Sequence, residues 1–239
     1  PEIFEGHYSV PMTGAVLNTI NIRLDAKTIA YILEHSEAKV LVVDRQLHIE
    51  VKKALGILKK KITIIDIIDQ HADQSKCEKI GELEYESFLN TGDENYDWKM
   101  PEDEWQAISL SYTSGTTGNP KGVELTHGNW SFEVESPDKA FLFQQGEKYI
   151  SWLPLAHSLG QFVDIHYWID KAMHLYIAES PLTLVDSAKE IQPHLFTSVP
   201  RLYEKIYSNV KSQLDSKPIL KVLLKIPIIS NLIQKKIKT

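Results

Sequence analysis

Apolar positions near the start of the chain follow two alternating patterns. Residues 26–37 and 47–58 carry apolar side chains at helical spacing, and Asp25 stands where an N-cap is expected. Residues 39–44 and 61–65 are continuous β-branched runs, typical of strands covered on both faces. Helices that alternate with buried strands predict right-handed βαβ units built on a parallel sheet.

The second half of the chain repeats this alternation. Pro200 stands at a favoured first position of a helix. We therefore predict an α/β fold with two βαβ-type subdomains, residues 1–128 and a partial second one, 129–239. The expected strands are 148–153, 172–177 and 194–199, and the expected helices are 158–170, 182–191, one from Thr126 to about Asp138 and one from Pro200.

Residues 112–122 read Tyr-Thr-Ser-Gly-Thr-Thr-Gly-Asn-Pro-Lys-Gly, between a strand-length run at 106–112 and the predicted cap at Thr126. The glycines permit backbone angles that turn N–H groups inward, and the hydroxyls can donate to phosphate oxygens. Lys121 adds a mobile positive charge. The string therefore predicts a phosphate-binding loop, with an ordinary surface turn as the alternative. Its spacing is neither the Walker pattern nor the dinucleotide fingerprint.

Composition narrows the candidate functions. A formal net charge of −6 disfavours nucleic acid as the main partner, because binding to nucleic acid requires a basic face on the protein. The single cysteine, Cys77, excludes an internal disulfide, and the histidines show no ligand spacing, so we predict no protein-held metal. No signal-peptide pattern and no bilayer-length apolar run is evident. We expect a cytoplasmic protein, with peripheral membrane contact as an added hypothesis.

That membrane hypothesis comes from residues 217–239, which hold six lysines and no acidic residue. A basic amphipathic stretch can lie on an anionic membrane surface. Pro227 interrupts any single long helix, which favours a helix pair that packs on other parts of a protein.

The whole 112–122 string resembles the phosphate loop of the adenylate-forming superfamily, which includes acyl-CoA synthetases, luciferases and peptide-synthetase adenylation domains. Residues 103–115 are similar to the corresponding part of short- and medium-chain acyl-CoA ligases, whereas 125–129 and 152–157 resemble long-chain fatty acid–CoA ligases. The resemblance implies contacts to the β- and γ-phosphates of ATP. The phosphate contacts so implied are Thr113, Ser114, Gly115, Thr116, Thr117, Gly118 and Lys121.

The resemblance also implies a reaction and its substrates. An AMP-forming acid–thiol ligase of this kind joins a fatty carboxylate to ATP and then passes the acyl group to coenzyme A, a reaction of lipid metabolism. Magnesium would arrive with the ATP phosphates. His157, Val199 and Pro200 are placed by resemblance at an acyl and nucleotide pocket, and a structural role is the alternative for His157. The sequence fixes no acyl chain length and no oligomeric state.

Other family motifs have no counterpart in the sequence. It contains neither Tyr-Gly-x-Thr-Glu nor Tyr-Arg-Thr-Gly-Asp, and no C-terminal domain with the family's catalytic lysine. We therefore assign no catalytic residue, and we expect an incomplete N-terminal domain that is inactive alone. The alternatives are a non-catalytic ATP- or lipid-binding module and a membrane-surface interaction protein.

Overall fold

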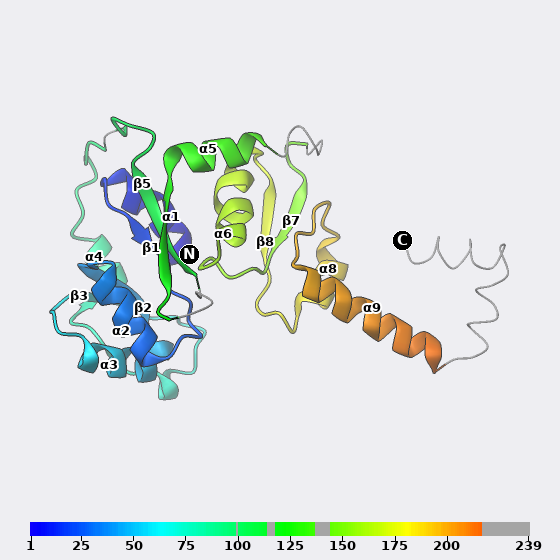
Figure 1. Ribbon diagram of the computed structural model, residues 1–239, viewed down its shortest axis with the longest axis horizontal. Coiled ribbons are helices and arrows are strands. Elements are labelled where there is room, and N and C mark those ends of the chain that lie inside the picture. The colour runs from blue at the N-terminus through cyan, green and yellow to red at the C-terminus, as the bar shows by residue number, and fades with distance from the viewer. Residues whose placement is uncertain (99, 114–117, 137–143, 217–239) are drawn as a thin grey trace. The chain divides into compact units, whose positions relative to one another are not determined.

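The computed structural model describes residues 1–98, 100–113, 118–136 and 144–216, and the account below concerns these residues. They form two compact units, Pro1–Leu195 and a second that begins at Phe196. The first unit contains three small sheets with helices packed beside them (Figure 1). The predicted division near residue 128 stays a prediction.

One sheet is parallel, as the sequence predicts. It has the order β2 (Val40–Asp44), β3 (Thr63–Ile67) and β4 (Leu83–Glu84). Helix α2 (Ala26–His35) begins at Asp25, whose carboxylate accepts hydrogen bonds from the backbone N–H groups of the next turn, so the predicted N-cap is confirmed. Helix α2 packs on α3 (His48–Ile57). Their shared core contains Ala26, Ile29, Ala30, Leu33 and Ala54.

The second sheet carries the glycine-rich string. Strand β1 (Leu17–Asn18), which follows helix α1 (Glu2–Met12), runs parallel to β5 (Ala107–Thr113), and β6 (Lys121–Thr126) runs antiparallel to β5. The expectation that the loop leads directly to a helix is wrong, because a six-residue strand intervenes. The backbone groups of β6 pair with those of β5. A loop in place of β6 would leave these β5 groups without partners.

The third sheet pairs β7 (Lys148–Ser151) with β8 (His174–Ile177) in parallel. The segment between them begins with α6 (Ser158–Gly160), continues as the π-helix η4 (Gln161–Tyr167) and ends with α7 (Trp168–Asp170). Tyr149, Val163, Tyr167 and Met173 form its buried core. Helix α5 (His127–Glu135) packs on η4, and α8 (Leu184–Ile191) packs on β7.

The predicted strand at 194–199 does not form. Leu195 makes an isolated bridge to Tyr149, and the residues after it are irregular. The Lys148 backbone N–H donates to the imidazole of His194. A longer strand at 194–199 would need this N–H for its own backbone hydrogen bonds to β7. Pro193 and Pro200, which cannot donate backbone hydrogen bonds, stand at the two ends of this run.

The remaining described elements are short or belong to the second unit. Within that unit, α9 (Pro200–Asp215) begins at Pro200, as predicted. No helix in the described ranges is long and apolar enough to cross a membrane. The short connecting elements of the first unit are η1 (Arg45–Leu47), η2 (Gln74–Lys76) and α4 (Tyr85–Leu89).

Candidate functional site

The β5–β6 hairpin brings the two ends of the glycine-rich string together. Thr113 is paired with Lys121, and Tyr112 with Gly122, at the end of the hairpin nearest the string. The predicted contacts Ser114, Gly115, Thr116 and Thr117 lie outside the described residues, so their roles stay predictions. The described geometry therefore defines the base of the predicted phosphate loop.

Thr113 and Lys121 present polar groups on one face of this hairpin. Side chains of directly opposed residues in an antiparallel pair stand on the same face, about 5 Å apart at Cβ. Both residues are exposed, and neither side chain makes an ion pair or a hydrogen bond with the described part of the chain. A hydroxyl donor and an ammonium group side by side, both open to a ligand, are suited to a phosphate group.

Gly118 adopts a backbone conformation that favours glycine. Its φ is +96°, and a Cβ added there would meet no atom within 4 Å, so conformation, rather than space, is the reason for glycine at this position. This supports the expectation that the string's glycines serve its backbone angles. The contacts of Gly118 with a phosphate remain a prediction.

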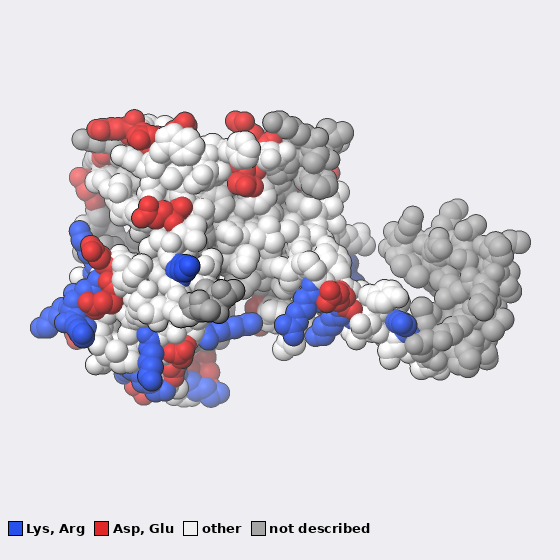
Figure 2. Space-filling view, in the orientation of Figure 1, with Lys and Arg blue, Asp and Glu red and all other residues white. Residues whose placement is uncertain are grey.

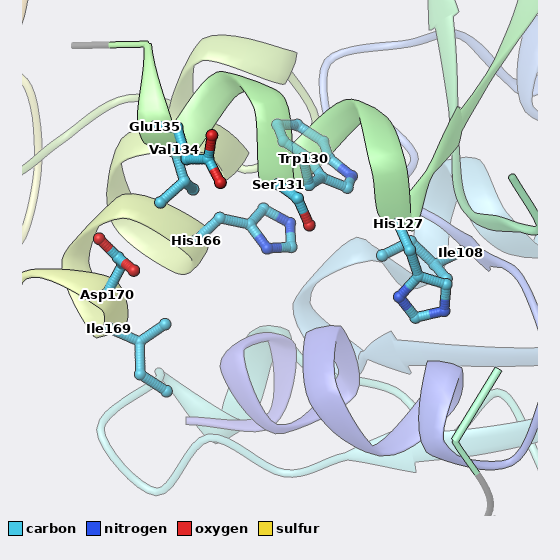
Figure 3. Close-up of a pocket in the computed structure, with 9 residues that line it drawn as sticks. All are labelled: Ile108, His127, Trp130, Ser131, Val134, Glu135, His166, Ile169 and Asp170. Atoms are coloured by element: carbon cyan, nitrogen blue, oxygen red, sulfur yellow. The ribbon is translucent and has the colours of Figure 1, made fainter. Parts of the chain in front are cut away.

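A cavity of about 530 Å³ lies beside α5 and is lined by residues of α5, η4 and α7 and by Ile108 of β5 (Figure 3). Trp130 and His166 form its inner wall with stacked rings, whose centroids are 4.3 Å apart. Burial, with smaller contributions from His7 and His127, lowers the pKa of His166 to about 4, so this wall is neutral at neutral pH.

The cavity's rim argues against a polyphosphate ligand there. Glu135 and Asp170 both line it. Figure 2 shows further acidic side chains gathered over α5 and the segment that precedes β5. Like charges repel, so the hairpin end with Lys121 suits a nucleotide's phosphates better than this cavity does.

His157 makes a local hydrogen bond in the described geometry. Its Nδ1 accepts a hydrogen bond from the Leu159 backbone N–H at 3.2 Å, so the ring caps α6. The ring is exposed and does not line the cavity. Val199 and Pro200 belong to the second unit, so the proposed grouping of these three residues stays a prediction.

Two polar contacts near the hairpin have no signal in the sequence. Gln161 is fully buried, and its Nε2 donates to Thr19 Oγ1 at 2.8 Å and to the Leu155 carbonyl at 2.9 Å. His35 lies 2.7 Å from the hydroxyl of Tyr112, measured at Nδ1. Gln161 and Thr19, and likewise His35 and Tyr112, are far apart in the chain, so only the fold brings them together.

The described residues offer no donor set for a metal ion. No three His, Cys, Asp or Glu side chains in the described ranges lie close enough together to hold one. No chemical step is therefore assigned to a metal ion held by these residues.

The described residues define an α/β protein in which the β5–β6 hairpin brings together the two ends of the predicted phosphate loop. The family model described as "AMP-binding enzyme" matches residues 1–227, and the chain belongs to this family. The resemblance to adenylate-forming enzymes is thereby confirmed.

Three relatives illustrate the similarity. An acetate–CoA ligase of Humulus lupulus is 43% identical over 170 residues, which cover 67% of this chain and 30% of the relative. A peroxisomal acetate/butyrate–CoA ligase of Arabidopsis thaliana is 39% identical over 170 residues, with the same coverage of 67% and 30%. A crystal structure of a long-chain-fatty-acid–CoA ligase from Archaeoglobus fulgidus has a TM-score of 0.70 and 19% identity, and the match covers 88% of this chain and 40% of that one.

These comparisons set the extent of the similarity. The α/β fold of an adenylate-forming enzyme is confirmed, with only part of that fold in the chain. The chain spans about three-tenths of the length of the curated relatives it matches.

Proposed function

We propose that the chain is the phosphate-binding part of an AMP-forming acyl-CoA ligase. In this reaction a carboxylate oxygen attacks the α-phosphorus of ATP, forming acyl-adenylate and releasing pyrophosphate. The thiolate of coenzyme A then attacks the acyl carbon, forming the thioester and releasing AMP. Family membership and relatives named as CoA ligases support this proposal.

The carrying observation is the Thr113–Lys121 pair at the base of the glycine-rich string. During adenylation, negative charge grows on the bridging oxygen and on the departing pyrophosphate. A positioned ammonium group and hydroxyl stabilise that charge without reorganising, which is usually the largest contribution to such catalysis. Magnesium, when bound with ATP, supplies further neutralisation of the phosphates. The role of Lys121 and Thr113 is thus to hold the polyphosphate and stabilise its departure.

Calorimetric titration of the 239-residue chain with ATP and with pyrophosphate tests this role. We expect Lys121→Ala to weaken binding of both about tenfold, because one charge-assisted hydrogen bond is lost. Lys59→Ala is the matched control, since it removes one exposed positive charge away from the hairpin. Equal affinity in wild type and Lys121→Ala, or no binding by the wild-type chain, would contradict the proposal. We expect no ATP–pyrophosphate exchange by the chain alone.

The proposed acyl substrate is a fatty carboxylate. The relatives' names cite acetate and butyrate, which supports an aliphatic acid, and the 152–157 segment resembles long-chain ligases. A chimera in which this chain replaces the matched 170 residues of the Humulus lupulus ligase tests chain length. Exchange that is faster with longer fatty acids than with acetate supports the proposal, and exchange with acetate alone rejects it.

A further inference from the structure

An aromatic contact joins helix α2 to the base of the phosphate loop. The Nδ1 atom of His35 lies 2.7 Å from the Tyr112 hydroxyl, and the two rings meet edge to face with centroids 5.8 Å apart. On its other side, His35 stacks on Tyr31 at 5.3 Å. Burial, and then Tyr31, raise the pKa of Tyr112, so its hydroxyl keeps the proton it can donate to the imidazole.

The ring of Tyr112 continues this contact to the next strand. A Cβ added to Gly122 would lie 3.3 Å from Tyr112 Cζ and 3.1 Å from Leu110 Cδ1, so glycine at this position lets the ring lie closely on β6. Gly122 is bonded to Lys121, and Tyr112 to Thr113. The ring therefore lies at the cross-strand pair next to Thr113 and Lys121, on the opposite face of the hairpin.

Helix α2 and the end of the β5–β6 hairpin differ in how firmly the rest of the structure holds them. Helix α2 is well anchored, because Ile32 and Leu33 are each only 1% exposed and Asp25 caps its start. The first residues of β6, from Lys121 to Glu124, are all exposed. The hydrogen bond joins His35 of this fixed helix to Tyr112 of β5, which is paired with Gly122 in the exposed start of β6. It therefore restricts the end of the hairpin more than it restricts the helix.

We propose that His35 is a positioning residue for the phosphate site: through Tyr112 it holds the end of the β5–β6 hairpin so that Thr113 and Lys121 face one polyphosphate. This inference rests on the proposed function. It adds to the phosphate site a residue that lies 77 positions before Tyr112 in the sequence. His35 itself touches no substrate in this scheme. Its loss lowers affinity by leaving the binding pair less ordered before the ligand arrives.

Residue-resolved amide exchange by NMR tests the tether without any ligand. His35→Ala and Tyr112→Phe should both speed exchange at the amides of 121–123, and leave those of α3 unchanged. His35→Asn should preserve slow exchange, because its amide group occupies the place of Nδ1, whereas His35→Gln places its amide nearer the position of Nε2. His71→Ala, at another exposed histidine, is the matched control.

Titration of the same variants with inorganic tripolyphosphate tests positioning. We expect His35→Ala and Tyr112→Phe each to weaken binding about three- to tenfold, the usual range for one hydrogen bond. The double variant should be no weaker than either single one, because both changes remove the same contact. His35→Asn should stay within about twofold of wild type by the same argument. Melting temperatures confirm that each variant is folded.

The outcomes separate this inference from the proposed function. If wild type binds tripolyphosphate but His35→Ala binds equally well, the positioning role is overturned and the proposed function stands. If exchange speeds up while affinity is unchanged, His35 is only a structural tether, which also overturns the inference. If wild type binds no tripolyphosphate, the proposed function fails, and unchanged exchange in His35→Ala would independently exclude the tether.

Discussion

Gly81 lies where a single added methyl group would disturb a buried charge. A Cβ there would be 2.4 Å from the Ile64 carbonyl oxygen, which is backbone and cannot rotate away. The Gly81 N–H donates to Asp66 Oδ1 at 2.8 Å, and Arg45 Nε donates to Oδ2 of the same fully buried carboxylate at 2.8 Å. An alanine at this position therefore has to shift, which strains the backbone and weakens the hydrogen bonds that stabilise the buried carboxylate.

We expect Gly81→Ala to lower the free energy of unfolding by about 3 kcal/mol, measured by urea denaturation. Gly56→Ala is the matched control, because Gly56 lies in α3 with no atom within 4 Å of an added Cβ. Alanine in a helix is preferred to glycine, so this control should be stabilised by roughly 0.5 kcal/mol. An unchanged or increased free energy of unfolding in Gly81→Ala, as in the control, would show that the segment before β4 relaxes freely.

At the scale of elements, local patterns predict what local forces determine. The apolar faces of α2 and α3 are confirmed, and β2 and β3 form where their β-branched runs predict strands. The expectation that β2 is covered on both faces is wrong, because Val43 is buried while Val40 and Val42 are exposed. Asp25 and Pro200 mark helix starts for reasons within one turn. Strand β6 was not predicted, because its partner β5, rather than its own composition, makes it a strand.

The candidate site likewise has a part that the sequence predicts and a part that only the fold creates. The glycine-rich string was predicted because its residues are adjacent in sequence, and the structure adds the Thr113–Lys121 pairing. The contacts of Gln161 with Thr19 and of His35 with Tyr112 join residues 142 and 77 positions apart. No periodicity or motif encodes such a pair, since it arises only when separate elements pack. The π-helix η4 likewise has no local signature in its sequence.

Helix α5 begins with a reciprocal cap, whose contribution to stability can be measured. The Thr126 hydroxyl accepts the Asn129 backbone N–H at 3.1 Å, while the Asn129 side chain accepts the Thr126 N–H at 3.0 Å. We expect Thr126→Ala to lower the free energy of unfolding by about 1 kcal/mol in urea denaturation. Thr126→Ser keeps the hydroxyl and should lose much less. Equal losses in both variants would mean that the methyl group, rather than the cap, is what stabilises this end.

At the scale of the whole first unit, three buried groups with large pKa shifts contribute to how stability depends on pH between about pH 4 and pH 7. Burial lowers the pKa of His7 to about 4, and burial together with His7 and His127 lowers that of His166 to about 4. Burial raises the pKa of Asp164 to about 6, although the hydroxyls of Ser151 and Tyr149 partly oppose it. All three groups are less costly to bury neutral than charged.

These shifts oppose one another in the free energy of unfolding. Between pH values of about 4 and 6.5 the unfolded histidines bind protons that the folded ones do not, so stability rises with pH. Between about 4 and 6 folded Asp164 keeps a proton that the unfolded carboxyl has lost, so its contribution falls as pH rises. Two histidines outweigh one carboxyl, and the net change should be a gain of about 3 kcal/mol from pH 4 to pH 7.

Urea denaturation at several pH values separates the three groups. Asp164→Asn should make the rise steeper, because it removes the opposing contribution. His166→Phe keeps a ring against Trp130 and should remove most of the rise, because the contributions of His7 and Asp164 then nearly cancel. His71→Phe, at an exposed site, should leave the slope unchanged. A free energy of unfolding that falls from pH 5 to pH 7 in the wild-type chain would contradict the balance, and would mean that burial of Asp164 costs more than burial of both histidines. The packing of η4, which carries Asp164 and His166, would then be the element most weakened at neutral pH.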